Sequence, residues 1–149
     1  MSDIPDYKKG VGVAICSAGP IGTLVSWLGL LISAPSNWRD TLPSLLVVMS
    51  LSLFIGAFVA AVPAIFGVSV MAHIGRRSEG ARTYTAWGLA GAFGGAIFMT
   101  QIAMLFEGAD PFLSPHPFVW LMTLHGAATG ALCALLARRY VRWLPEESE

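Results

Sequence analysis

Four long apolar stretches, separated by short polar connections, dominate the pattern of the chain. They cover about residues 10–33, 43–74, 83–106 and 117–140, and none contains Asp, Glu, Lys or Arg before the last turn of the fourth. A membrane-spanning helix needs about 20 mostly apolar residues. The pattern therefore predicts an all-α membrane protein whose four transmembrane helices form a bundle, with residues 1–149 as a single integral membrane domain.

The second stretch is longer than a membrane requires. Its 32 residues would make a helix of about 48 Å, whereas the hydrocarbon core of a bilayer is about 30 Å thick. Pro63 lies two thirds of the way along this stretch, and proline removes a backbone hydrogen bond and clashes with the preceding turn. We expect a kink near Pro63, and Pro20 is a second candidate hinge in the first stretch.

The basic residues predict the orientation. With four spans, one side of the membrane carries a single basic residue, Arg39, and the other side carries eight. These eight are Lys8, Lys9, Arg76, Arg77, Arg82, Arg138, Arg139 and Arg142. Because basic residues favour the cytoplasmic side, we expect both termini in the cytoplasm. The chain has seven arginines and two lysines, a composition compatible with a bacterial protein, and we expect a bacterial inner membrane as the location. The six arginines of this set are also candidate contacts for anionic lipid headgroups.

Small residues recur at intervals of four in every stretch. The glycines of these stripes are Gly22, Gly56, Gly88, Gly91, Gly95, Gly126 and Gly130. A spacing of four keeps residues on one helix face, and small residues let helix backbones approach closely in lipid, where no hydrophobic effect draws helices together. We expect tight small-xxx-small packing between the helices. Because the third stretch has two such faces, we also expect a homo-oligomer or a complex with other membrane subunits.

The composition of the chain excludes several classes of function. Hydrophobic residues make up 55% of the chain and charged residues 12%, where an ordinary soluble domain has about 25% charged residues. The formal net charge is zero, which excludes a nucleic-acid binder that relies on positive charge. The helices lack carboxylates, and the sequence has no recognisable nucleophile or metal-binding motif. We therefore expect no enzymatic activity, no metal and no cofactor.

One polar cluster within the helices is a candidate site. His125 lies about eight residues into the fourth stretch, and Gln101 lies about five residues from the corresponding end of the third. Rough matching of depth places them within about one turn of each other, with Thr100 and Thr123 nearby. Two interpretations stay open. The cluster either joins helices by hydrogen bonds, or it forms a site for a quinone headgroup, an ion or a small polar solute.

Three functions fit these features. The first is a non-enzymatic inner-membrane protein that acts by helix packing, as an accessory subunit or a homo-oligomer, in contact with membrane lipids and other membrane subunits. The second is a small channel or transporter for a neutral or weakly charged solute, suggested by the two prolines and by similar small-residue motifs at residues 18–22 and 90–94. The third is a quinone-contacting subunit of a redox complex. We take the first as the working hypothesis.

Overall fold

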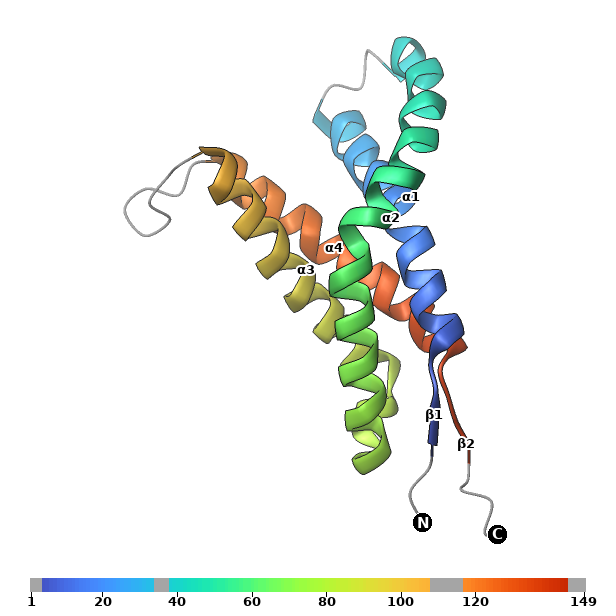
Figure 1. Ribbon diagram of the computed structural model, residues 1–149. Coiled ribbons are helices and arrows are strands. Elements are labelled where there is room, and N and C mark those ends of the chain that lie inside the picture. The colour runs from blue at the N-terminus through green and yellow to red at the C-terminus, as the bar shows by residue number, and fades with distance from the viewer. Residues whose placement is uncertain (1–3, 34–37, 108–116, 145–149) are drawn as a thin grey trace, which may run out of the picture.

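Four long helices make up most of the computed structural model, which describes residues 4–33, 38–107 and 117–144 (Figure 1). They are α1 (Lys8–Ser33), α2 (Trp38–Arg77), α3 (Tyr84–Glu107) and α4 (Pro117–Tyr140), and the short 3₁₀ helix η2 (Gly80–Arg82) lies between α2 and α3. Each long helix contains a segment long and apolar enough to cross a membrane: Lys8–Gly29, Val47–Arg77, Tyr84–Leu105 and Pro117–Tyr140. The prediction of an all-helical chain with four helices of membrane-spanning length is confirmed.

Helix α2 differs most from the expected boundaries. It begins at Trp38 and ends at Arg77, with 40 residues, whereas the apolar pattern indicates about residues 43–74. Hydropathy marks only the apolar part of a helix, and polar turns at either end can remain helical. The helix continues through Pro63 without interruption, and Figure 1 shows it changing direction along its course. Pro20 likewise lies inside the continuous helix α1.

Two short strands join the ends of the described chain. β1 (Ile4–Asp6) and β2 (Arg142–Leu144) pair in antiparallel register, so that Pro5 lies opposite Trp143 and Asp6 opposite Arg142. The first and last described segments therefore lie side by side at one end of the helices (Figure 1). The sequence pattern does not predict this pairing, because three residues are too few to show the alternation of a strand.

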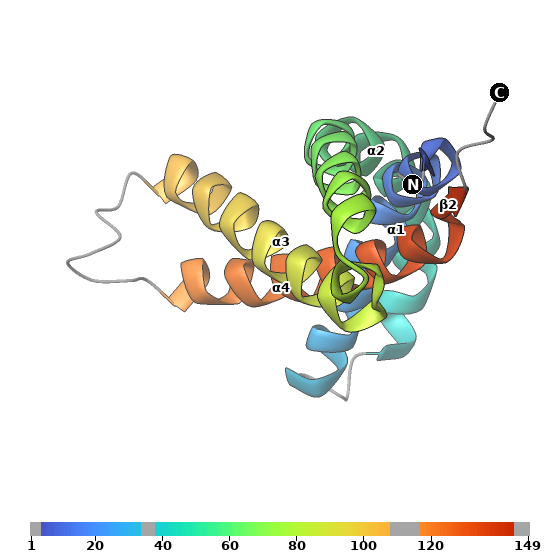
Figure 2. The ribbon, with the colours of Figure 1, turned by 90° about the horizontal axis from the view of Figure 1, so that it is seen from below.

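Glycines define the contact between α3 and α4. Gly91 and Gly95 of α3 face Gly130 and Gly126 of α4, and a methyl group built on any of the four would overlap a backbone carbonyl oxygen of the facing helix. The two backbones therefore touch, and the helices pack along much of their length (Figure 2). A side chain at any of these positions would hold the helices apart.

Helices α1 and α2 meet in the same way. A methyl group at Gly19 would overlap the carbonyl oxygen of Ser52, and one at Gly56 would overlap the backbone of Gly19. Gly88 of α3 lies in a looser contact, because a Cβ built there would be 3.4 Å from the side chain of Leu135. In both hairpins, α1–α2 and α3–α4, the backbones of the two helices are therefore in direct contact at glycines.

The core lies at the end of the molecule that carries the strands. Trp87 is the largest fully buried side chain among the described residues, and its indole N–H donates a hydrogen bond of 3.0 Å to the carbonyl oxygen of Ala81. Small and branched residues from the other elements surround it: Ala14, Val68, Ala72, Ala137 and Val141. Residues of all four helices therefore meet around one tryptophan.

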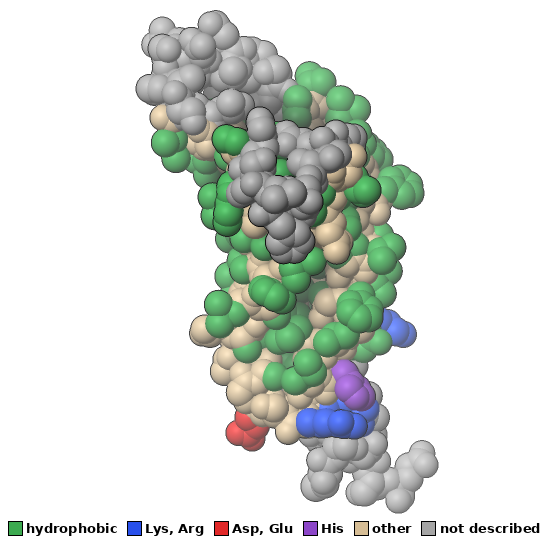
Figure 3. All heavy atoms as spheres, turned by 90° about the vertical axis from the view of Figure 1, so that its left-hand side faces the viewer, with side chains coloured by type: hydrophobic (Ala, Val, Ile, Leu, Met, Phe, Trp, Pro, Cys, Tyr) green, Lys and Arg blue, Asp and Glu red, His purple; other side chains and the backbone are tan. Residues whose placement is uncertain are grey.

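The helices form two hairpins, α1–α2 and α3–α4, which α1 and α4 join along a seam that reaches from the core to Ser26 and His125. The α1–α2 and α3–α4 hairpins point in different directions (Figures 1 and 2), and α2 and α3 share few contacts. Large apolar side chains are exposed on the outer faces of all four helices. Figure 3 shows that apolar side chains cover one face over most of its height, with charged side chains gathered at one end. This distribution suits a lipid environment better than water.

Replacing Gly95 by alanine should destabilise the α3–α4 hairpin. The new Cβ would overlap the carbonyl oxygen of Gly126, and overpacking of this kind costs about 1–3 kcal/mol. Gly67→Ala is the matched control, because a Cβ at Gly67 meets nothing within 4 Å and alanine favours the helix by up to about 1 kcal/mol. Unfolding in detergent, followed by circular dichroism, should give a lower midpoint for Gly95→Ala alone. Equal midpoints for the two variants would contradict the observed contact.

Candidate functional site

A polar seam between α1 and α4 surrounds His125. The imidazole Nδ1 lies 3.4 Å from Oγ of Ser26 on α1. Gly22 provides space beside the ring, since a Cβ built there would lie 3.5 Å from Nε2 of His125 and 3.9 Å from Oγ1 of Thr129, one turn further along α4. The seam therefore brings one imidazole and two hydroxyl groups together within two of the apolar helices.

Two buried polar atoms of these helices have no hydrogen-bond partner among the described residues. They are Oγ1 of Thr129 and the indole nitrogen of Trp27. An unpaired buried polar group costs about 1–3 kcal/mol, so native proteins rarely keep one. The unpaired hydroxyl of Thr129 and Nε2 of His125 both lie within 4 Å of a Cβ built on Gly22. A water molecule or a carbonyl group of a small ligand has the chemistry to pair with both.

Thr100 and Thr123 join α3 to α4. Their hydroxyl oxygens are 2.6 Å apart, and each also lies near a carbonyl oxygen one turn back in its own helix, at 2.7 Å from Ala96 and 2.8 Å from Val119. Each hydroxyl has one proton, so the pair donates two hydrogen bonds among these three contacts. Both protons are used inside the protein, which makes the pair a link between helices rather than a site for a ligand.

Gln101 lies apart from His125. It is exposed on α3, whereas the ring of His125 contacts α1. Gln101 follows Thr100 by one residue and is rotated by about 100° around α3, while His125 follows Thr123 by two residues and is rotated by about 200° around α4. The structure therefore brings Thr100 and Thr123 together, places His125 on a different seam, and leaves Gln101 on an outer surface.

At the strand end, Arg82 and Arg138 turn inward around Trp143. Their guanidinium carbons lie 5.2 and 4.6 Å from the centre of the indole ring. Trp143 donates to the carbonyl oxygen of Ala72 at 3.2 Å, Arg82 to that of Gly75 at 2.7 Å, and Arg138 to that of Arg82 at 2.5 Å. Gly75 leaves room for the ring, because a Cβ there would lie 2.7 Å from it. We call Arg82, Arg138 and Trp143 the tryptophan clasp, which fastens β2 to the end of α2.

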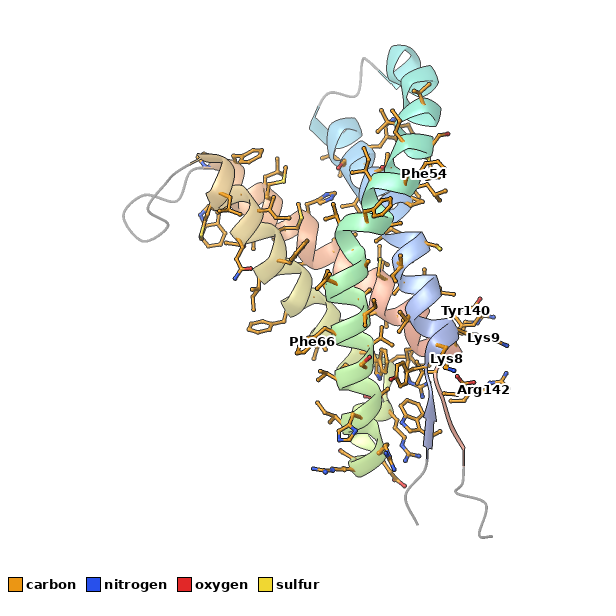
Figure 4. The ribbon with its side chains drawn as sticks, in the orientation of Figure 1. Lys8, Lys9, Phe54, Phe66, Tyr140 and Arg142 are labelled. Carbon is orange, nitrogen blue, oxygen red and sulfur yellow. The ribbon has the colours of Figure 1, made fainter. Side chains whose placement is uncertain are left out.

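The arginines that the sequence suggests as lipid contacts fall into two groups, those that are half-buried and those that are exposed. Arg82 and Arg138 are half-buried and hold the fold together, and Arg76 is also half-buried. The exposed basic side chains at this end are Lys8, Lys9, Arg77, Arg139 and Arg142. Figure 4 shows Lys8, Lys9, Tyr140 and Arg142 grouped where α1 begins and α4 ends. Sequence reasoning missed the clasp, because its residues lie on both sides of α3 in the sequence and meet only in the folded chain.

The described residues contain no group of three or more His, Cys, Asp or Glu side chains that could hold a metal ion. Comparisons of the chain with protein family models, curated proteins and solved structures find no significant match. The function is therefore argued from the surfaces and contacts of this chain itself.

The hydroxyl pair between α3 and α4 should be energetically coupled. Hydrogen bonds between membrane helices contribute about 0.6 kcal/mol on average and up to about 1.7 kcal/mol. A double-mutant cycle with Thr100→Val and Thr123→Val, measured by unfolding in detergent, should give a coupling energy in this range. The control cycle uses Gln101→Leu and His125→Leu, whose coupling should be near zero because the two side chains do not touch. Stronger coupling in the control cycle would contradict the geometry.

Replacing Trp143 by alanine should release the paired strands. The two arginine contacts contribute about 0.5–2 kcal/mol each, so losing both should raise the opening of the strand pair by about fivefold or more. Amide hydrogen exchange at residues 4–6 and 142–144 measures this opening. Trp120→Ala is the control, because Trp120 is 59% exposed and belongs to α4 rather than to the clasp. The same increase in both variants would show that the clasp does not hold the strands.

Proposed function

We propose that the chain is a non-enzymatic, multi-pass protein of the bacterial inner membrane that acts by packing its helices against a second copy of itself. Both termini lie in the cytoplasm in this proposal. One observation carries it: a glutamine amide, that of Gln101, is exposed within an apolar face of α3.

The distribution of side chains supports the membrane location. The outer faces carry large exposed apolar residues such as Leu28, Phe58, Phe93 and Leu124. Figure 4 shows Phe54 and Phe66 on α2, away from the basic group at the ends of α1 and α4. Eight of the nine basic residues belong to the strand end or to the helix ends beside it. That asymmetry favours a cytoplasmic position for this end.

The outer α3 face is an apolar stripe interrupted by one amide. Leu89, Phe93, Ile97 and Leu105 are spaced by four or eight residues and are between 44% and 84% exposed. Gln101 occupies the remaining position of the stripe and is exposed as well. It lies four residues, or about 6 Å, before the end of the apolar segment Tyr84–Leu105. A carboxamide that faces hydrocarbon without a partner is unfavourable.

A second copy of the chain provides a matching partner for this amide. A carboxamide both donates and accepts hydrogen bonds, so two Gln101 side chains related by a two-fold axis can bond to each other. Gly94 lies two turns from Gln101 on the same side of α3, and a Cβ built there meets nothing within 4 Å. A neighbouring helix can therefore approach closely at Gly94 while the amides pair at Gln101.

The other glycines of α3 do not report on assembly. Gly91 and Gly95 are in backbone contact with Gly130 and Gly126 within the same chain. Large substitutions at these positions would open the hairpin, and any loss of oligomer would then follow from a damaged fold. Substitutions at Gly94 and Gln101 can therefore test self-association without opening the hairpin.

Gln101→Leu and Gly94→Leu should shift the protein from dimer to monomer. Loss of an interhelical hydrogen bond of about 0.6–1.7 kcal/mol raises the dissociation constant roughly 3- to 20-fold. Energy transfer between differently labelled copies, measured in liposomes over a range of protein-to-lipid ratios, gives that constant. Gly67→Leu is the matched control, because Gly67 is another helical glycine with open space around it. The proposal would be wrong if the parent chain is monomeric, or if Gly67→Leu raises the dissociation constant as much as the two test variants do.

A further inference from the structure

A shallow hollow of about 590 Å³ lies on α2 beside the residue that precedes α1. Its lining is apolar at Phe66 and Val70 and polar at Ser69, His73 and Arg76, and Tyr7 closes one side. The volume falls within the range of about 300–1,000 Å³ that small-molecule sites occupy. The sequence names Arg76 among six candidate contacts for anionic lipid headgroups, but it does not reveal the hollow, because Tyr7 and the lining residues of α2 lie 59 to 69 residues apart and meet only in the folded chain.

The polar side chains of the hollow are free to bind a ligand. Within the described chain, Tyr7, Ser69, His73 and Arg76 make no side-chain hydrogen bond. Arg82 and Arg138, by contrast, are held in the tryptophan clasp. Arg76 is therefore a half-buried cation with its hydrogen-bond donors unused, beside two hydroxyl groups and an imidazole.

The hollow is amphipathic along the axis of α2. Phe66 and Arg76 are ten residues apart, so about 15 Å of helix separates the apolar end from the cationic end. Arg76 lies next to the last residue of the apolar segment Val47–Arg77, where a bilayer would give way to its headgroups. Asp6, the acidic neighbour of Tyr7 in the chain, lies opposite Arg142 in the strand pair.

We propose that this hollow binds one anionic phospholipid. The phosphate accepts hydrogen bonds from the guanidinium of Arg76 and from Tyr7 and His73, and an acyl chain lies along Val70 and Phe66. A zwitterionic lipid fits less well, because its positively charged headgroup amine would approach Arg76. The inference rests on the proposed membrane location and does not depend on dimerisation.

Native mass spectrometry of the full chain in detergent, with phosphatidylglycerol or phosphatidylcholine added, tests the proposal. The parent chain should retain one phosphatidylglycerol under conditions that remove phosphatidylcholine. Arg76→Gln should weaken that retention about fivefold, which corresponds to roughly 1 kcal/mol for the loss of its hydrogen bond to the phosphate. Arg77→Gln is the matched control, since Arg77 is the next residue, is exposed and does not line the hollow. Its effect should stay below about twofold, because it contributes only long-range attraction.

Val70→Trp supplies a second test that leaves the charge unchanged. The larger side chain fills the apolar part of the hollow, so phosphatidylglycerol retention should fall to the level of phosphatidylcholine. Equal losses in Arg76→Gln and Arg77→Gln would overturn the proposal, as would equal retention of the two lipids or displacement by soluble glycerol phosphate. Gln101→Leu should retain phosphatidylglycerol as the parent does, which separates a failure of the proposed dimer from a failure of this site. If the chain does not fractionate with membranes, the proposed dimer in the membrane and the proposed lipid site are both wrong.

Discussion

The structure depends on the absence of side chains at the points where its helices touch. In lipid, apolar surfaces gain nothing by leaving their surroundings, so attraction between helices comes from close contact, which weakens within an ångström of separation. Gly91 and Gly130, Gly95 and Gly126, and Gly19 with Gly56 bring backbones into that contact. The large side chains are consequently left to face outward. One constraint therefore produces both the close seams and the apolar surface.

The same constraint explains why the molecule divides into two hairpins. Each hairpin has its own backbone seam, whereas α2 and α3 meet only near the connection between them, where Trp87 fills the space against Val68 and Ala72. The strand pair and the tryptophan clasp add their contacts at this same end. Contacts between the hairpins therefore extend from this end along α1 and α4 as far as Ser26 and His125, and the hairpins diverge beyond that region (Figure 1).

Local features of the sequence predict the helices but not the directions in which they face. Hydropathy is local, so the four spans and their approximate ends can be inferred from the sequence. The positions of His125 and Gln101 along their helices suggest that they lie close together, yet the two residues point to different neighbours, because direction depends on which helix faces are packed. Gly94 and Gly95 are adjacent glycines, and only the fold shows that Gly95 touches α4 while Gly94 is open. The clasp around Trp143 joins residues 72–82 to residues 138–143, and no local pattern reveals a contact between such distant segments.

The pairing of β1 with β2 also determines the order in which parts of the chain can fold during synthesis. During synthesis β1 emerges first, and 135 residues separate Asp6 from Arg142. At about 5–20 residues per second, the first strand waits roughly 7 to 27 s for its partner. In that interval α1 can already pack against α2, while the segment before it stays unpaired. The ends can close only after Leu144 has been made, so the earliest part of the chain to appear is among the last to take its final form.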